Sequence, residues 1–301
     1  MKQNVHEYYF EGFQKNFLPI EDLLGESYNS LIKAVPSVKL SLFPKLSETI
    51  GGFRAREFSI LCGSTGAGKT TFMANLSASL ITDKVPHYVA SVETGSLDYV
   101  RRILSVLADE DLNTGEVFPE AKIYSIHKRY GHMLTTKSLQ LALHENRTSV
   151  EQLMAEILYA HENFGAKIAV IDNLNFFMDV TTVQNQILEM DRVIHELVIF
   201  CKQVDIHLIM VMHPNKGSGK NGSTRVESEY DIKGSSTAVQ EAHNVFLLNR
   251  PSKENVDAKI LSPNNRELKI AKMRRLGGSV GKVFILSTEN YVRYREEGVL
   301  G

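Results

Sequence analysis

The sequence has little of what marks a secreted, membrane-bound or metal-thiolate protein. Its 301 residues include two cysteines, Cys62 and Cys201, which lie in apolar stretches without the spacing of metal ligands. No apolar run approaches the length of a membrane span, and residues 1–7 contain no apolar signal core. We therefore expect reduced cysteines in the core of a cytoplasmic protein that has no membrane partner.

The sequence also lacks a strong overall charge. The formal net charge is −1 at pH 7, so no global basic field indicates a nucleic-acid partner. Residues 213–295 are the exception, because they carry 15 Lys or Arg against 8 Asp or Glu. This local excess favours a surface that faces a polyanion. A solvated face, balanced by the acidic remainder of the chain, explains the same numbers equally well.

One motif is the most informative part of what the sequence does contain. Residues 63–70 read Gly-Ser-Thr-Gly-Ala-Gly-Lys-Thr, which fits the phosphate-binding pattern G-x-x-x-x-G-K-[ST]. The apolar residues 57–62 before it are typical of a buried strand, and residues 71–80 after it are typical of a helix. This context makes a chance glycine-rich turn a poor explanation, so we expect a nucleoside triphosphate site.

The chemistry of that motif assigns roles to its residues. Glycines let backbone N–H groups surround a β-phosphate, and the following helix directs its positive end at the same anion. Lys69 is expected to reach the β- and γ-phosphates and Thr70 to bind Mg²⁺. The expected nucleotide contacts are Gly63, Ser64, Thr65, Gly66, Ala67, Gly68, Lys69, Thr70 and Thr71.

From about residue 51 the sequence alternates strand-like and helical segments, which predicts an α/β fold with a largely parallel twisted sheet flanked by helices. A capping pattern at residues 148–151 predicts a helix to about residue 164, and a second long helix is predicted over 183–204. The last three predicted strands lie close together and indicate a mixed or hairpin-rich edge. The predicted strands are 58–62, 87–92, 122–126, 168–172, 207–212, 245–249, 268–272 and 283–287.

The first 50 residues differ from this alternation. An apolar stripe of helical spacing ends before Pro36 and must be buried on its own domain or on a neighbouring subunit. We predict an N-terminal helical linker or oligomerisation segment over residues 1–40 and an ATPase domain over 41–301. The stripe consists of Ile20, Leu23, Leu24, Tyr28, Leu31, Ile32 and Val35.

Three polar residues follow predicted strands and are candidates for chemistry. Residues 167–172 form an apolar strand that ends in Asp172, the arrangement that places a carboxylate near the Mg²⁺ held by Thr70. Glu93 ends the next strand after the phosphate-binding motif and is suited to orient an attacking water, although it would also serve as a helix cap. His213 ends a third strand, where it would contact the γ-phosphate or simply cap the strand.

Two basic segments complete the pattern. Residues 214–225 are too polar and rich in glycine to form a core, so we expect a mobile loop. Residues 270–278 end a strand with Lys272, Arg274 and Arg275 followed by two glycines. Arginine suits an anion because its guanidinium stays charged and binds phosphate in a planar fork. By itself this segment is typical of a basic surface turn.

Together these residues resemble the RecA-like motor domain of ring-shaped replicative helicases, which include the DnaB type, the phage primase-helicases and the mitochondrial Twinkle helicase. The resemblance covers about residues 41–295 and begins with a lead-in at 43–57. Residues 231–240 are similar to a family block, in which Lys233 replaces the usual Arg and Ser236 a Gly. Five motifs occur in the family's order: the phosphate-binding loop and the segments that contain Glu93, Asp172, His213 and Arg274.

The resemblance implies a role for each matching residue. Glu93 matches the catalytic glutamate, Asp172 the metal-binding acid and His213 the γ-phosphate sensor. Arg250 matches an arginine placed against adenine. Arg274 matches an arginine finger that reaches the neighbouring subunit's site, and Lys272 is its companion.

The resemblance also implies a function. It predicts an ATP- and Mg²⁺-dependent DNA helicase, a homohexameric ring that moves 5′→3′ on single-stranded DNA, in a host cytoplasm if a phage encodes it. Lys216, Lys220 and Arg225 would grip DNA in the channel. A primase, polymerase or loader would be a further partner; no primase domain or zinc segment is expected. The alternatives are a RecA/RadA- or KaiC-like oligomeric ATPase without strand separation, and a non-catalytic nucleotide-gated module.

Overall fold

The computed structural model describes residues 19–33, 35–91, 93–142, 148–173, 183–215, 225–233, 236–251, 262 and 264–300. It divides into two compact units, Met1–Pro36 and Ser37–Gly301. None of the helices in these ranges is long and apolar enough to cross a membrane.

The first unit contains the helix α2 (Ile20–Ile32). Its apolar side chains are exposed, with Leu24 at 62% and Tyr28 at 66%. The helix ends at Ile32, four residues before Pro36, where the chain becomes extended at Lys33. A helix is therefore present where the apolar stripe predicted one, and the stripe has no cover within the described part of this unit.

The second unit is built on one sheet, whose described strands run in the order β3-β2-β4-β5-β1-β6-β7-β8-β9. The strands from β3 to β6 pair in parallel, whereas β7, β8 and β9 pair antiparallel. This confirms a parallel sheet with a hairpin-rich edge. The strands are β1 (Phe58–Cys62), β2 (His87–Ser91), β3 (Leu139–Leu141), β4 (Ile168–Asp172), β5 (His207–Met212), β6 (Asn244–Asn249), β7 (Arg266–Met273), β8 (Val283–Ser287) and β9 (Arg295–Leu300).

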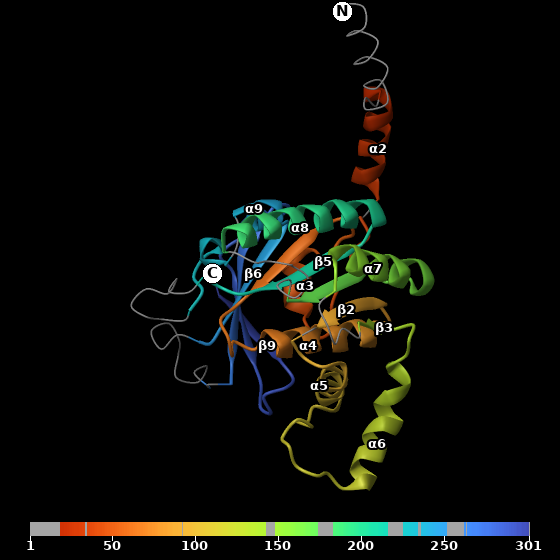
Figure 1. Ribbon diagram of the computed structural model, residues 1–301, viewed down its shortest axis with the longest axis vertical. Coiled ribbons are helices and arrows are strands. Elements are labelled where there is room, and N and C mark those ends of the chain that lie inside the picture. The colour runs from red at the N-terminus through yellow and green to blue at the C-terminus, as the bar shows by residue number, and fades with distance from the viewer. Residues whose placement is uncertain are drawn as a thin grey trace, which may run out of the picture. The chain divides into compact units, whose positions relative to one another are not determined.

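Helices cover both faces of this sheet (Figure 1). Alternate residues of β1 show the two cores, since Ile60 belongs to one buried cluster and Leu61 to the other. Apolar residues on both faces of each central strand are what a doubly covered parallel sheet requires. One face packs against α3 (Pro44–Ile50), α4 (Lys69–Thr82) and α5 (Ser96–Ala108), and the other against α7 (Val150–Phe164), α8 (Val183–Val204) and α9 (Ser236–Glu241).

Three details differ from the sequence prediction. The strand predicted at residues 122–126 is wrong, because these residues lie in α6 (Glu120–Tyr130). Ile123 and Ile126 are three residues apart and pack on one side of that helix against Leu104 and Leu112. The structure adds β3 and β9, which the sequence analysis missed. The N-cap of α7 is Ser149, which accepts a hydrogen bond from the Gln152 N–H (3.2 Å), so the capping pattern acts one residue later than predicted.

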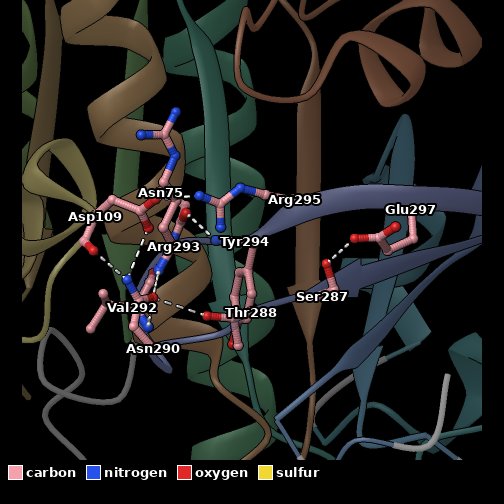
Figure 2. Close-up of polar contacts among 10 residues, drawn as sticks. All are labelled: Asn75, Asp109, Ser287, Thr288, Asn290, Val292, Arg293, Tyr294, Arg295 and Glu297. Atoms are coloured by element: carbon pink, nitrogen blue, oxygen red, sulfur yellow. Dashed lines mark hydrogen bonds and ion pairs between the residues drawn. The ribbon is translucent and has the colours of Figure 1, made fainter. Parts of the chain in front are cut away.

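A polar network fixes the connection between β8 and β9 to the helices beneath it (Figure 2). The fully buried Asn75 of α4 donates to the Val292 carbonyl (2.6 Å) and accepts from the Tyr294 N–H (2.8 Å). Asn290 donates to the carbonyl and carboxylate of Asp109, at the end of α5. Because the amide of Asn75 satisfies two buried backbone groups, this network holds α4 firmly against the β8–β9 edge.

Candidate functional site

The loop between β1 and α4 has the shape that the glycine motif predicts. A Cβ atom on Gly63 would lie 2.5 Å from the Leu248 carbonyl oxygen, so only glycine fits there. Gly66 and Gly68 have φ angles of +75° and +96°, which side chains other than glycine rarely adopt. Helix α4 then begins at Lys69, so its N-terminal N–H groups face the loop. Ser64 is half-buried and Thr65 exposed in the loop, and Thr70 and Thr71 lie in the first turn of α4.

Lys69 is held inside this loop. The residue is only 7% exposed, and its Nζ donates to the carbonyls of Gly63 (2.8 Å) and Ser64 (3.1 Å). Burial lowers the pKa of Lys69, while the nearby Asp172 opposes that shift. The ammonium is thus positioned at the concave side of the loop, where phosphate oxygens would bind.

Parallel strands bring the other predicted residues to the same edge. Asp172 ends β4, Glu93 lies just beyond β2, and His213 follows β5 directly. Thr70 Oγ1 donates to Asp172 Oδ2 at 3.5 Å. The carboxyl ends of neighbouring parallel strands are where ligands bind in open α/β sheets.

Asp172 is a buried carboxyl, 1% exposed. Burial and the charge of Glu93 raise the pKa of Asp172 to about 6, although Lys69 and Thr70 stabilise the charged form. Mg²⁺ keeps several waters and takes one or two protein oxygens beside the substrate phosphates. Thr70 and Asp172 supply an oxygen pair of this kind, so the residues present fit a magnesium ion.

His213 connects Lys69 with Glu93. Its Nδ1 lies 3.4 Å from Lys69 Nζ, and its Nε2 lies 4.0 Å from Glu93 Oε2. Burial and the Lys69 charge lower the pKa of His213. Because a protonated lysine only donates, Nδ1 is the acceptor and the imidazole proton sits on Nε2, facing the glutamate.

Two arginines, one after β6 and one at the start of β7, contact backbone carbonyls of the loop. Arg250 follows β6 and donates to the Gly66 carbonyl (3.4 Å), and Arg266 donates through Nε to the Ala67 carbonyl (2.7 Å). A Cβ atom on Gly68 would lie 2.6 Å from the Tyr294 hydroxyl. Sequence analysis found Arg250 but missed Arg266 and Tyr294. No motif signals these two, since strand pairing alone brings them to the loop.

Lys272 and Arg274 lie away from the phosphate loop of the same chain. Lys272 Nζ donates to the carbonyls of Val239 and Gln240, and the Arg274 guanidinium also donates to Gln240. Met273 pairs with Asn244, which pairs with Ser59 near the start of β1. At roughly 3.3 Å per residue, the length of β1 separates this turn from Gly63. The chain therefore does not bring these cations to its own Lys69.

The residues predicted to grip DNA are only partly placed. Lys216 and Lys220 lie outside the described residues. Arg225 is described, and its guanidinium binds Glu267 and the Arg250 carbonyl (3.0 Å). Lys233 is exposed. A DNA contact by any of these side chains stays a prediction.

Comparison with known proteins identifies the family and the fold. The family described as "DnaB-like helicase C terminal domain" matches residues 40–296. The fold is similar to a solved structure described as an ATPase domain, with a TM-score of 0.77 and 16% identity over 93% of this chain and 99% of that one. A DnaB-like replicative helicase, described with its interactions with primase, gives a TM-score of 0.75 and 16% identity over 92% of this chain and 68% of that one. The predicted RecA-like fold is thereby confirmed.

Proposed function

The chain belongs to the family of DnaB-like helicase C-terminal domains, and we propose that it is the ATP-hydrolysing motor of a replicative DNA helicase. In this proposal it forms a homohexameric ring and moves 5′→3′ along single-stranded DNA. The ring and the polarity rest on the family resemblance.

Within one copy, the residues at the sheet edge would bind ATP and prepare the reaction. Backbone N–H groups of residues 63–70 and the Lys69 ammonium hold the β- and γ-phosphates. Thr70 and Asp172 would hold Mg²⁺, which would supply positive charge beside the phosphate oxygens. Glu93 accepts a proton from water as the water oxygen bonds to the γ-phosphorus, and the bond to the leaving ADP breaks. His213 presents its Nε2 proton beside Glu93 and Nδ1 beside Lys69.

One observation supports an oligomer in particular. Lys272 and Arg274 lie at the end of the sheet opposite the phosphate loop, so they would reach a nucleotide only on another copy. A guanidinium supplied in trans stabilises charge that develops in phosphoryl transfer. The exposed apolar side of α2 gives the same copies a surface to bury.

Single-stranded DNA is the proposed track. The positive excess of residues 213–295 includes Lys216 and Lys220, and a phosphate backbone binds such a surface through counterion release. A primase, polymerase or loader is a further proposed partner, and the cytoplasm is the proposed location.

Unwinding of a labelled duplex tests this function. A duplex with a 5′ single-stranded tail should be separated only when ATP and Mg²⁺ are present, and a 3′-tailed duplex should remain intact. Lys69→Ala is the matched inactive control, since it removes the ammonium without touching the predicted DNA residues. Rapid ATP hydrolysis without separation of either duplex would contradict the proposal and favour a RecA/RadA- or KaiC-like ATPase.

A further inference from the structure

The residues on both sides of the proposed DNA-binding loop are fixed beside the nucleotide site. On the leaving side, the Lys233 N–H donates to the His213 carbonyl (2.8 Å) and the Asn215 N–H to the Asp231 carbonyl (2.7 Å). Pro214 and Ile232 form an antiparallel bridge. Residues 213–215 and 231–233 are therefore joined to each other directly at His213, the proposed γ-phosphate sensor.

The returning side is fixed to the end of β6. The Val226 N–H donates to Asn249 Oδ1 (2.9 Å), and Asn249 Nδ2 donates back to the Val226 carbonyl (2.7 Å). Both bonds are buried, and the residue before them is Arg225. The position of Arg225 therefore follows that of β6.

Arg225 makes an ion pair with a buried carboxylate, while its own side chain is 27% exposed. Its guanidinium binds the carboxylate of Glu267, whose side chain is 6% exposed, and donates to the Arg250 carbonyl at 3.0 Å. Removing one partner of such a pair leaves a buried charge without compensation. Because the carboxylate is buried, the contact constrains Arg225 more than an ion pair between two exposed side chains would.

The same two residues lead to the phosphate loop by two short routes. Arg250 donates from its own side chain to the Gly66 carbonyl (3.4 Å). Arg266, the neighbour of Glu267 on β7, donates to the Ala67 carbonyl (2.7 Å). A shift of Arg225 would therefore act on both carbonyls through directly bonded groups.

We propose that Arg225 is a positioning residue that couples single-stranded DNA to the nucleotide loop through Glu267 and Arg250, and that it is not a DNA contact. The proposal rests on the proposed helicase function, because it requires a DNA-responsive ATPase. Coupling of this kind is reciprocal, so nucleotide in the loop would also change the affinity for DNA.

Glu267→Gln distinguishes a positioning role of Arg225 from a direct DNA contact. It removes the negative charge opposite the guanidinium while keeping the shape of the partner and leaving Arg225 itself intact. ATP hydrolysis is measured with and without a poly-dT oligonucleotide, and the affinity for that oligonucleotide is measured by fluorescence anisotropy at fixed salt. We expect stimulation by DNA to fall by about fivefold or more, with DNA affinity within about twofold of the wild type.

Glu227→Gln is the matched control, because it makes the same change at an exposed position two residues from Arg225. It should behave as the wild type does. Stimulation retained in Glu267→Gln would overturn the inference. Tighter DNA binding with higher stimulation would overturn it as well, since it would show a released Arg225 that grips DNA.

A double variant guards against damage to the fold. Arg225→Gln with Glu267→Gln removes both charges, so no unpaired charge is left buried. If the pair acts as a unit, the double variant loses no more stimulation than Glu267→Gln alone. If the double variant keeps the wild-type melting temperature but loses more DNA stimulation than Glu267→Gln alone, the inference would be overturned. A wild type that DNA does not stimulate would instead contradict the proposed function itself.

Discussion

Thr70 and Asp172 are 102 residues apart in sequence, yet Thr70 Oγ1 lies 3.5 Å from Asp172 Oδ2. The parallel order β4-β5-β1 produces this contact, because it brings Asp172, the last residue of β4, to the same edge as the first turn of α4, which follows β1. A hydroxyl and a carboxylate this close would supply an oxygen pair for Mg²⁺.

Glu93→Gln should leave ATP binding largely intact and slow hydrolysis by about 10²–10⁴-fold, since the amide no longer accepts a proton. The Glu93 side chain is half exposed, so its replacement should not disturb the core. Steady-state phosphate release and the affinity for a fluorescent ATP analogue separate the two effects. Hydrolysis within threefold of wild type would remove Glu93 from the catalytic role.

The central strands and their terminal residues could be predicted from sequence because a doubly covered strand is a continuous apolar run. Phe58–Cys62, Ile168–Asp172 and His207–Met212 all have this pattern. The strand predicted at 122–126 failed because a short run with apolar residues three apart also suits one side of a helix.

The remainder of the site depends on pairing that composition does not encode. β9 is an edge strand with exposed charged residues and has no apolar run. Arg266 begins β7, which pairs antiparallel with β6, and Tyr294 immediately precedes β9, which pairs with β8, so only the folding of this antiparallel edge brings both residues to the phosphate loop. Lys272 and Arg274 could be recognised by their spacing, but their distance from Lys69 required the register of β6 and β7.

The apolar side of α2 should control assembly. Leu24→Asp combined with Tyr28→Asp should weaken oligomers by about tenfold or more, because each large apolar side chain contributes about 1.5–3 kcal/mol when buried. Asn29→Asp on the same helix is the control for added charge. Mass photometry across a concentration series measures the effect. Unchanged oligomers, with both substitutions present, would show that this helix packs elsewhere.

Buried His207 should make the free energy of unfolding fall in acid. Its Nδ1 donates to the Arg54 carbonyl (2.6 Å), so Nε2 accepts from Ser59 Oγ (2.9 Å), and protonation would remove that acceptor. Burial lowers the pKa of His207 to about 4. The unfolded chain takes up the proton near pH 6.5 and the folded one does not.

Stability from His207 is therefore complete above about pH 6.5 and is lost progressively as the pH falls toward about 4. His207→Gln should reduce the slope of unfolding free energy against pH by close to one proton in this window. Urea unfolding at a series of pH values measures the slope. An unchanged slope would show that His207 is charged in the folded protein.

The central claim is that the ATP site is completed by Arg274 from a second copy. Lys69→Ala and Arg274→Ala should each abolish hydrolysis, since one removes the phosphate ligand and the other the charge supplied in trans. In an equal mixture, about one junction in four joins an intact Lys69 to an intact Arg274. ATPase activity of the mixture with single-stranded DNA should therefore recover in part. Mixtures that stay inactive at every ratio, while labelled subunits demonstrably exchange, would contradict the claim, as would full activity of Arg274→Ala alone.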